Sequence, residues 1–334
     1  MEYWKEINNK LKPWIDNDLN KTVVDLFAGC GGLSLGFEAN GFKTIGYEMN
    51  ENASATYNSN LLGECITEKL TPESTYPKAD IVIGGPPCQP FSVGGKQLGL
   101  KDSRDGFPIF ISAVKRLNPQ VFMFENVRGI LYKNRWYLKE VIDALNGLGY
   151  HIDFALLNAV HYEVPQNRER VIVLGSKQPI KLPRPIHKTV TAGEALGKLA
   201  SEFDENSKFF TKSMDLYVAN YEKASKCINP RDLYLDRPAR TLTCRNLAGA
   251  TGDMHRVRLK DGRRRRITVR EAARLQSFPD WFEFQGTETH QFNQIGNAVA
   301  PNFAYHLASN IKNHLIGTTP QENPLTEPQQ LKLF

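Results

Sequence analysis

The 334-residue sequence predicts an α/β fold: a mostly parallel β-sheet with helices on both faces, joined to a smaller and less regular domain. Three observations support this prediction. Short strand-like runs alternate with helical segments through the first half of the chain, the runs are apolar throughout, and the rhythm stops near Ser176. Continuous apolar strands that alternate with helices are typical of a parallel sheet covered on both faces.

The elements follow from local patterns in chain order. Strands are expected at 21–27, 43–48, 79–85, 120–126, 151–159 and 170–176, and helices at 28–41 and 52–62. Thr268 and Glu271 have the spacing of a capping box, and Pro279 should end the helix that they begin. In the last helix one face is apolar, formed by Phe303, Leu307, Ile311 and Leu315.

Composition divides the chain into four parts. A helical extension (1–20) precedes the main domain, which is expected to comprise 21–176 and 290–316. Residues 177–289 form the second domain, and the Pro-, Gln- and Thr-rich tail 317–334 looks disordered.

Whole-chain properties exclude several classes of protein. No apolar run approaches a membrane span, and the first residues do not resemble a signal peptide. The five cysteines form no CxxC pair, which argues against a zinc cluster, and their odd number suggests reduced thiols and a cytoplasmic protein. The net charge of +6 fits a polyanionic partner without deciding the point.

A glycine-rich turn after the first strand is the first candidate binding site. Gly29, Gly31 and Gly32 stand between a strand and a helix, where backbone N–H groups suit a carboxylate or phosphate. Glu48 closes the next strand about 20 residues on, where an acidic side chain can bind ribose hydroxyls. The spacing is not GxGxxG, which disfavours a dinucleotide. The alternative is a tight strand–helix turn without a ligand.

Cys88 is the candidate nucleophile. It follows two prolines and precedes a third, directly after a predicted strand, and glycines at 94, 95 and 99 follow. Prolines restrict the local backbone and so aim the side chain, whereas the glycines leave the next segment free to cover a site. The alternative is a buried structural thiol, the usual fate of an intracellular cysteine.

Glu125 ends the next apolar strand, in "FMFENV". Ligands in parallel sheets bind beyond the carboxyl ends of the strands, so its carboxyl should face the same cleft as Cys88 and could donate a proton there. The alternative is a solvated strand terminus.

Taken together, the sequence resembles the C5 cytosine-specific DNA methyltransferases of bacterial restriction–modification systems. The matching blocks span residues 25 to 301: "DLFAGCGG", "GYEMN", "GGPPCQPFS", "FENV", "VPQNRER", "RITVREAARLQSFP" and "QIGNAVAP". The resemblance implies the Rossmann-like sheet of S-adenosylmethionine-dependent methyltransferases and a target-recognition domain at 177–289. One position departs from the family, since Cys65 stands where an Asp usually precedes Ile66 and contacts the adenine of the cofactor.

The resemblance assigns roles to four catalytic residues. It implies that the Cys88 thiolate adds to C6 of cytosine, so that C5 attacks the methyl group of S-adenosylmethionine. Glu125 would hold N3 and the 4-amino group, stabilising the charge that develops. Arg168 and Arg170 would orient the ring and its backbone, with Arg170 the candidate for the cytosine O2.

S-adenosylmethionine is therefore the expected cofactor, without a metal. The residues implied to bind it are Asp25, Phe27, Ala28, Gly29, Gly31, Gly32, Leu33, Glu48, Met49, Ile66, Pro86 and Asn297.

Duplex DNA is the expected partner, with the target cytosine flipped out of the stack. The segment 88–106 is the expected cover, and its candidate contacts are Gln89, Ser92, Lys96 and Arg104. Arg245 and Asn246 are the candidates for reading bases, although binding phosphate or their own loop is an equal alternative. The arginine run 263–266 is expected to form a phosphate-facing or interdomain patch, or else a solvated face.

Two other functions stay open from the sequence alone, a tRNA-methylating enzyme of the same family and an inactive DNA-binding relative. Expected partners in the cell are a cognate restriction endonuclease, in function only, and a bacterial sliding clamp, with the enzyme located in the cytoplasm at the nucleoid. The clamp hypothesis rests on a QLxLF-type ending formed by Gln330, Leu331, Leu333 and Phe334, and the alternative is that this ending folds back on the protein.

Overall fold

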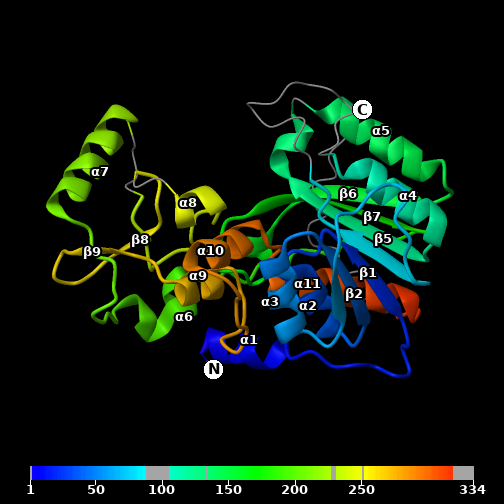
Figure 1. Cartoon of the computed structure of the whole chain (residues 1–334), viewed down its shortest axis with the longest axis horizontal. Helices are drawn as coiled ribbons and strands as arrows, with labels where there is room; N and C mark the ends of the chain where they lie inside the picture. The colour runs from blue at the N-terminus through cyan, green and yellow to red at the C-terminus, as the bar shows by residue number, and fades with distance from the viewer. Residues whose placement is uncertain (1, 88–104, 133, 227–230, 250–251, 319–334) are drawn as a thin grey trace.

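The computed structural model describes residues 2–87, 105–132, 134–226, 231–249 and 252–318. Two lobes make up this part of the chain, a larger one built on a seven-stranded sheet and a smaller one beside it (Figure 1). Among the described helices, none combines the length and the apolar character that a membrane span requires.

The sheet is mostly parallel, as predicted. Its strands are β1 (Thr22–Leu26), β2 (Lys43–Glu48), β3 (Glu64–Thr67), β4 (Ile81–Gly84), β5 (Val121–Val127), β6 (His151–Asn158) and β7 (Glu169–Ser176). They lie in the order β3-β2-β1-β4-β5-β7-β6. The first five strands in this order run parallel to one another, whereas β7 runs antiparallel to both β5 and β6.

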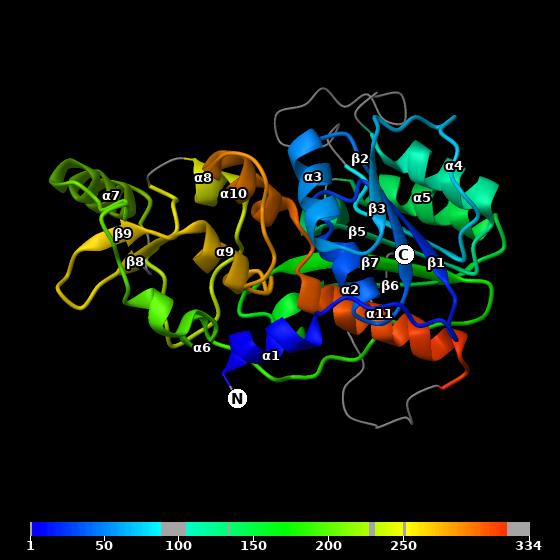
Figure 2. The same ribbon diagram turned by 60° about the horizontal axis from the view of Figure 1, so that its bottom comes forward.

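Helices cover both faces, which explains why the strands are apolar at successive positions. One face carries α2 (Gly32–Glu38), α3 (Glu51–Asn60) and α11 (Pro301–Leu315), and the other carries α4 (Phe107–Leu117) and α5 (Arg135–Asn146) (Figure 2). Side chains alternate between the faces of a strand, so Val23 packs towards α2 and α11 whereas Val24 packs towards α4.

The predicted last helix and the N-terminal extension are both present. In α11, Phe303, Leu307 and Ile311 are each at most 1% exposed, which confirms the predicted apolar face. In the extension, the helix α1 covers Tyr3–Lys10 only. The segment after it is tied to the main lobe through Trp14, whose Nε1 donates to the Ala39 carbonyl at 3.1 Å.

The smaller lobe contains short elements. They are α6 (Ala192–Leu196), α7 (Lys212–Ala224), α8 (Cys244–Ala248), β8 (Arg256–Arg258), β9 (Arg264–Arg266), α9 (Val269–Leu275) and α10 (Glu288–Asn297). Three single 3₁₀ turns lie among the described residues, at Arg128–Leu131, Ala159–Tyr162 and Gly197–Ala200. The capping box predicted from Thr268 and Glu271 is formed at the start of α9.

The arginine run 263–266 corrects a prediction. Arg265 is 1% exposed and donates to both carboxylate oxygens of Glu271 at 2.8 Å. Arg264 donates to Asp215 at 2.9 Å and also pairs with Asp232. These side chains form the polar core of the smaller lobe, so the run is neither a phosphate-facing patch nor a solvated face at these two positions.

The domain boundary predicted at residue 290 is not marked by a break in the core. Helix α10 packs against α8 and α9. One cluster of buried side chains includes Leu247 and Phe292 together with Leu35 and Tyr57 of the larger lobe. The boundary therefore stays a prediction.

His255 makes the stability of this protein depend on pH. It is 1% exposed, and burial together with the nearby Arg240 lowers its pKa from 6.5 to about 3. The unfolded chain therefore takes up a proton at a pH where the folded chain does not. Between pH 6 and pH 4, we expect wild-type protein to lose about 1.4 kcal/mol of unfolding free energy per pH unit relative to His255→Leu.

Urea unfolding of both proteins at pH 7, 6, 5 and 4 measures this difference. His151→Gln, a change at an exposed histidine of β6, is the matched control and should follow the wild type. Parallel pH profiles for the wild type and His255→Leu would contradict the expectation.

Candidate active site

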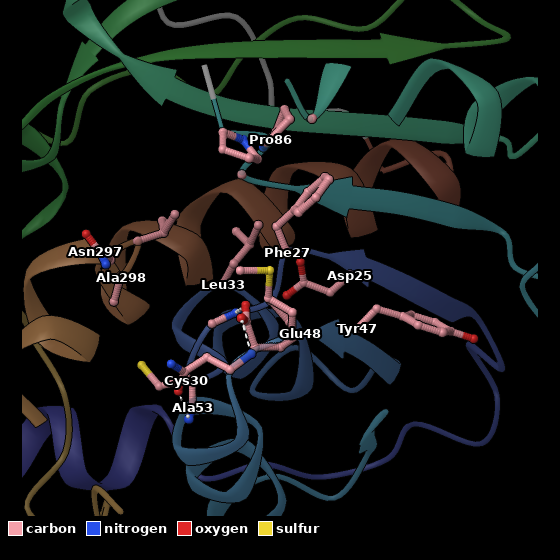
Figure 3. Close-up of a pocket in the computed structure, with 18 of the residues that line it drawn as sticks. Asp25, Phe27, Cys30, Leu33, Tyr47, Glu48, Ala53, Pro86, Asn297 and Ala298 are labelled. Carbon is pink, nitrogen blue, oxygen red and sulfur yellow. Dashed lines mark hydrogen bonds between the residues drawn. The ribbon is translucent and has the colours of Figure 1, made fainter. Parts of the chain in front are cut away.

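A cavity of about 930 Å³ lies at the carboxyl ends of β1, β2, β4 and β5. The strand order reverses between β1 and β4, which is where ligands bind in open sheets of this type. Strand ends form one wall, and α10 with the residues that follow it forms another (Figure 3). The volume suits a nucleoside-sized ligand.

Most of the residues predicted to bind a cofactor line this cavity. They are Asp25, Phe27, Ala28, Gly29, Gly32, Leu33, Glu48, Met49, Pro86 and Asn297, and Glu125 joins them. The same wall contains residues that sequence reasoning missed. Glu68 and Leu70 follow β3 at the same edge, a position that the strand-end rule could have revealed, whereas Asn293 and Gln294 arrive only through the packing of α10.

Gly31 and Ile66 are not among the residues that line the cavity, so the contacts predicted for them stay predictions. Gly31 is the N-cap of α2 with φ +86°, and a side chain there would meet Tyr57 at 2.7 Å. Ile66 is partly buried and packs against the apolar cluster under α4 and α5.

Glu48 is held at the rim by the glycine-rich turn. Its Oε2 accepts the Gly29 N–H at 3.0 Å, and its Oε1 accepts the Asn50 N–H at 2.8 Å. Gly29 has φ +56°, and a Cβ there would meet nothing within 4 Å, so the backbone is open to a ligand. A fixed carboxylate beside open backbone suits the hydroxyls of a ribose.

Asp25 supplies a buried carboxyl inside the cavity. It is 1% exposed, and its Oδ2 accepts the Ser34 hydroxyl at 2.7 Å. Its Oδ1 has no partner among the described residues. Burial, with the nearby Glu48, raises the pKa of Asp25 to about 7. A buried carboxyl with an open acceptor fits a cationic ligand group, such as an ammonium or sulfonium.

The Phe27 ring borders the same space. Its backbone has φ +61°, an uncommon conformation for a side-chain-bearing residue, at the end of β1. Figure 3 shows the ring between Leu33 and Pro86. This arrangement suits a planar ring stacked among apolar side chains.

Glu125 and Arg170 form an ion pair beside the segment that precedes Cys88. Arg170 Nε lies 2.6 Å from Glu125 Oε1, and the two side chains are 12% and 13% exposed. A Cβ on Gly85 would lie 3.8 Å from Glu125 Oε2. The prediction that Glu125 faces the cleft is thus confirmed by the cavity lining, and the solvated strand end is excluded.

The ends of the segment that carries Cys88 meet at the rim. The Pro87 carbonyl accepts the Gly106 N–H at 3.0 Å, and Asn126 Nδ2 donates to the Pro86 carbonyl at 3.0 Å. Cys88, Gln89, Ser92, Lys96 and Arg104 lie outside the described residues. The hydrogen bonds of Pro86 and Pro87 nevertheless place the start of this segment on the Glu125 side of the cavity.

Arg168 has partners other than those predicted for it, and its predicted role stays a prediction. It is 2% exposed, and its guanidinium donates to the carbonyls of Leu242 at 2.9 Å, Gly296 at 3.2 Å and Ala298 at 2.9 Å. Burial lowers its pKa to about 9, so it stays cationic at neutral pH. Arg168 joins the two lobes and lines neither cavity.

A second cavity, of about 570 Å³, adjoins the first through Val127. It is lined by Val127, Arg128, Gly129, Asn158, Asn167, Glu169, Arg170 and Thr241. Arg170 therefore stands between the two cavities, with its partner Glu125 in the first. The polar lining and the contribution of Thr241 from the smaller lobe suit a sugar–phosphate backbone.

Of the two predicted base-reading residues, one is exposed and one is not. Asn246 is 4% exposed and forms a capping box with Thr243, while its Nδ2 donates to the Thr241 carbonyl at 2.9 Å. Its amide is thus used within its own loop, which was the alternative considered. Arg245 is exposed on the short helix α8 and stays a candidate.

Within the described ranges, no group of three or more His, Cys, Asp or Glu could hold a metal ion.

Comparison with known proteins defines the class. The family model for C-5 cytosine-specific DNA methylases matches residues 21–313. The chain is 52% identical to the Type II methyltransferase M.AplI of Arthrospira platensis, over all of this chain and 98% of that protein. It is 31% identical to the Type II methyltransferase M.NgoFVII of Neisseria gonorrhoeae, over 92% and 89% of the two chains.

Solved structures have the same fold. A DNA modification methyltransferase encoded within a prophage of E. coli aligns with a TM-score of 0.64 at 26% identity, over 89% of this chain and all of that one. The Entamoeba histolytica methyltransferase EhMeth aligns with a TM-score of 0.68 at 18% identity, over 89% and 98%. The fold and the site together define a DNA methyltransferase.

In particular, this chain belongs to the C-5 cytosine-specific DNA methylase family.

Substitutions of the two arginines of "NRER", Arg168 and Arg170, should affect stability and activity differently. Arg168→Gln leaves buried carbonyls without donors, so we expect a loss of about 3 kcal/mol of unfolding free energy. Arg170→Gln should cost under about 1.5 kcal/mol, because Glu125 borders a cavity that water can enter, yet it should abolish methyl transfer. Urea unfolding and a methyl-transfer assay on duplex DNA, run on both variants, measure the contrast. Equal losses of stability would contradict it.

Proposed function

We propose that this protein transfers a methyl group from S-adenosyl-L-methionine to C5 of a cytosine flipped out of a specific short duplex DNA sequence. We further propose that it serves as the methyltransferase of a Type II restriction–modification system. The main support is that Glu125, which is paired with Arg170, lines the same cavity as Glu48 and the glycine-rich turn. A base-holding pair and a ribose-holding carboxylate then serve one site. The names of the relatives support the biological role.

The proposed chemistry requires activation of a weakly nucleophilic carbon. The Cys88 thiolate adds to C6, and the electron pair of the C5–C6 double bond becomes available at C5. Glu125 binds N3 and the 4-amino group and stabilises the charge that develops, while Arg170 holds the O2 side of the ring. After C5 is methylated, loss of the C5 proton restores the double bond and expels the cysteine thiolate.

The cofactor would be held by residues that line the large cavity. Glu48 would bind the ribose hydroxyls, Asp25 would face a cationic group, and Phe27 and Pro86 would border the adenine. When bound, S-adenosylmethionine supplies an electrophilic methyl group. Because Cys65 stands where the family usually has Asp, direct polar contact with the adenine would have to come from elsewhere.

DNA would occupy the space between the lobes. The second cavity would take the backbone of the flipped nucleotide, and Arg245 would meet base edges or phosphate. Lys96 and Arg104 would contact phosphates from the segment that carries Cys88. The enzyme would act in the cytoplasm, at the nucleoid, where a cognate endonuclease would cut the unmodified sequence.

Replacing the nucleophile tests the proposal. Cys88→Ala should abolish methyl transfer to duplex DNA and covalent trapping on a 5-fluorocytosine duplex, while calorimetric cofactor binding stays within about twofold, since Glu48 and the glycine-rich turn are intact. Normal turnover in this variant would refute the mechanism. Transfer by the wild type to tRNA but not to DNA would identify the tRNA-methylating branch, and transfer to neither would identify an inactive relative.

The C-terminal peptide provides a separate test of the clamp proposal. Gln330, Leu331, Leu333 and Phe334 lie outside the described residues, so the proposal rests on the sequence. A clamp-bound enzyme would have a raised local concentration at newly made DNA. A labelled peptide of residues 321–334 should bind purified sliding clamp in fluorescence anisotropy with a Kd at or below tens of micromolar (about 6 kcal/mol), and a peptide with Leu333→Ala and Phe334→Ala should not. Absence of binding by the unaltered peptide would eliminate the clamp proposal.

A further inference from the structure

A thiol of the smaller lobe contacts the wall of the large cavity. Cys244, the first residue of α8, places its Sγ 2.9 Å from Oδ1 of Asn297, the last residue of α10. The same Sγ lies 3.5 Å from the Asn293 carbonyl. Asn297 and Asn293 both line the large cavity. Helix α8 also carries the exposed Arg245, so one contact joins the cofactor side of the protein to its DNA side.

Helices α8 and α10 approach closely at this contact, and their packing leaves no room for one helix to shift along the other. A Cβ on Gly296 would lie 2.5 Å from the backbone nitrogen of Cys244, so only a glycine allows the approach. Arg168 fixes the same two segments, because its guanidinium donates to Leu242 on one side and to Gly296 on the other. The position of Cys244 against Asn297 is therefore set by backbone packing.

The contact also decides which way the Asn297 amide faces. A carboxamide has one acceptor end and one donor end. Burial raises the pKa of the Cys244 thiol, so the thiol keeps its proton and can donate to Oδ1. With the oxygen held in this way, the NH₂ group is the end that remains available to a ligand. Figure 3 shows Asn297 at the edge of the cavity beside Ala298.

We propose that Cys244 is a positioning residue that presents the Asn297 NH₂ group to the cofactor and thereby couples cofactor binding to the placement of α8 on DNA. The inference rests on the proposed function, since it names how that site is regulated. Coupling between two sites is reciprocal, so a cofactor that raises DNA affinity by a given factor must have its own affinity raised by DNA by the same factor.

Two substitutions at one position test the donor. Cys244→Ala removes it and should weaken S-adenosylmethionine binding about fivefold, the effect of one hydrogen bond. Cys244→Ser keeps a donor and is the matched control, so its cofactor affinity should stay within about twofold of wild type.

Calorimetry measures the cofactor affinity of each variant. Fluorescence anisotropy with a methylatable duplex, with and without S-adenosylhomocysteine, measures the coupling, which should shrink by the same factor in Cys244→Ala only.

A double-mutant cycle separates this role from general packing. In an Asn297→Ala background, Cys244→Ala should have no further effect on cofactor affinity, because the amide through which it acts is gone. An equal loss in both backgrounds would overturn the proposal, as would unchanged affinity and coupling in Cys244→Ala alone.

A second variant keeps the inference testable if Cys244→Ala does not fold. Asn297→Asp keeps an oxygen for the thiol and loses the NH₂ donor, so it should weaken cofactor binding by more than fivefold while its thermal unfolding stays near wild type. Cofactor affinity equal to wild type in Asn297→Asp would overturn the proposal. A wild-type protein that binds no S-adenosylmethionine would instead refute the proposed function.

Discussion

The buried guanidinium of Arg168 is the interaction on which the relation of the two lobes depends. It reaches three backbone carbonyls, one in the segment leading to α8, one in the last turn of α10 and one at the residue that follows α10. Arginine is suited to this role because its donors form a rigid planar fork. Gln166, two residues earlier, adds to the clamp, since its Oε1 accepts the Leu242 N–H at 2.9 Å and its Nε2 donates to the Leu275 carbonyl. The segment that enters β7 therefore sets the spacing between the cofactor cavity and the smaller lobe.

The smaller lobe keeps its shape through charges more than through a sheet. Its two strands have three residues each, and its interior contains Arg256 paired with Glu222 and Asp232 and Arg265 paired with Glu271. Buried ion pairs of this kind contribute little net stability, but losing one partner is costly because the other charge stays buried. Such a network fixes where α7 stands on the β8–β9 hairpin, because Glu222 belongs to α7 and Arg256 to β8. The role in reading DNA that is proposed for this lobe would require such a fixed geometry at its surface.

Two carboxylates in the large cavity differ in how many of their oxygens are already hydrogen-bonded. Glu48 is fixed by two backbone N–H groups, whereas Asp25 keeps one buried oxygen without a partner among the described residues. An unpaired buried acceptor destabilises the empty protein, and a cationic ligand would relieve that cost. Glu125, the ion-pair partner of Arg170, stands at the opposite side of the cavity, so the proposed base chemistry and cofactor binding would share one space.

The sequence by itself determined the features that depend on neighbouring residues along the chain. The apolar runs predicted the strands, Thr268 and Glu271 predicted a helix start, and the position of Glu125 at a strand end predicted that it faces the cavity. Such features are local, because a strand, a cap or a strand-end side chain is specified within a few residues. The tertiary structure decided which polar side chains are buried. Arg168, Asn246 and Arg265 are of residue types that often bind DNA. In the structure, however, each side chain forms hydrogen bonds within the protein, with partners distant in sequence or in its own loop. The cavity wall formed by α10 and its contact with Cys244 likewise exist only because helices far apart in the chain pack together, which no local pattern specifies.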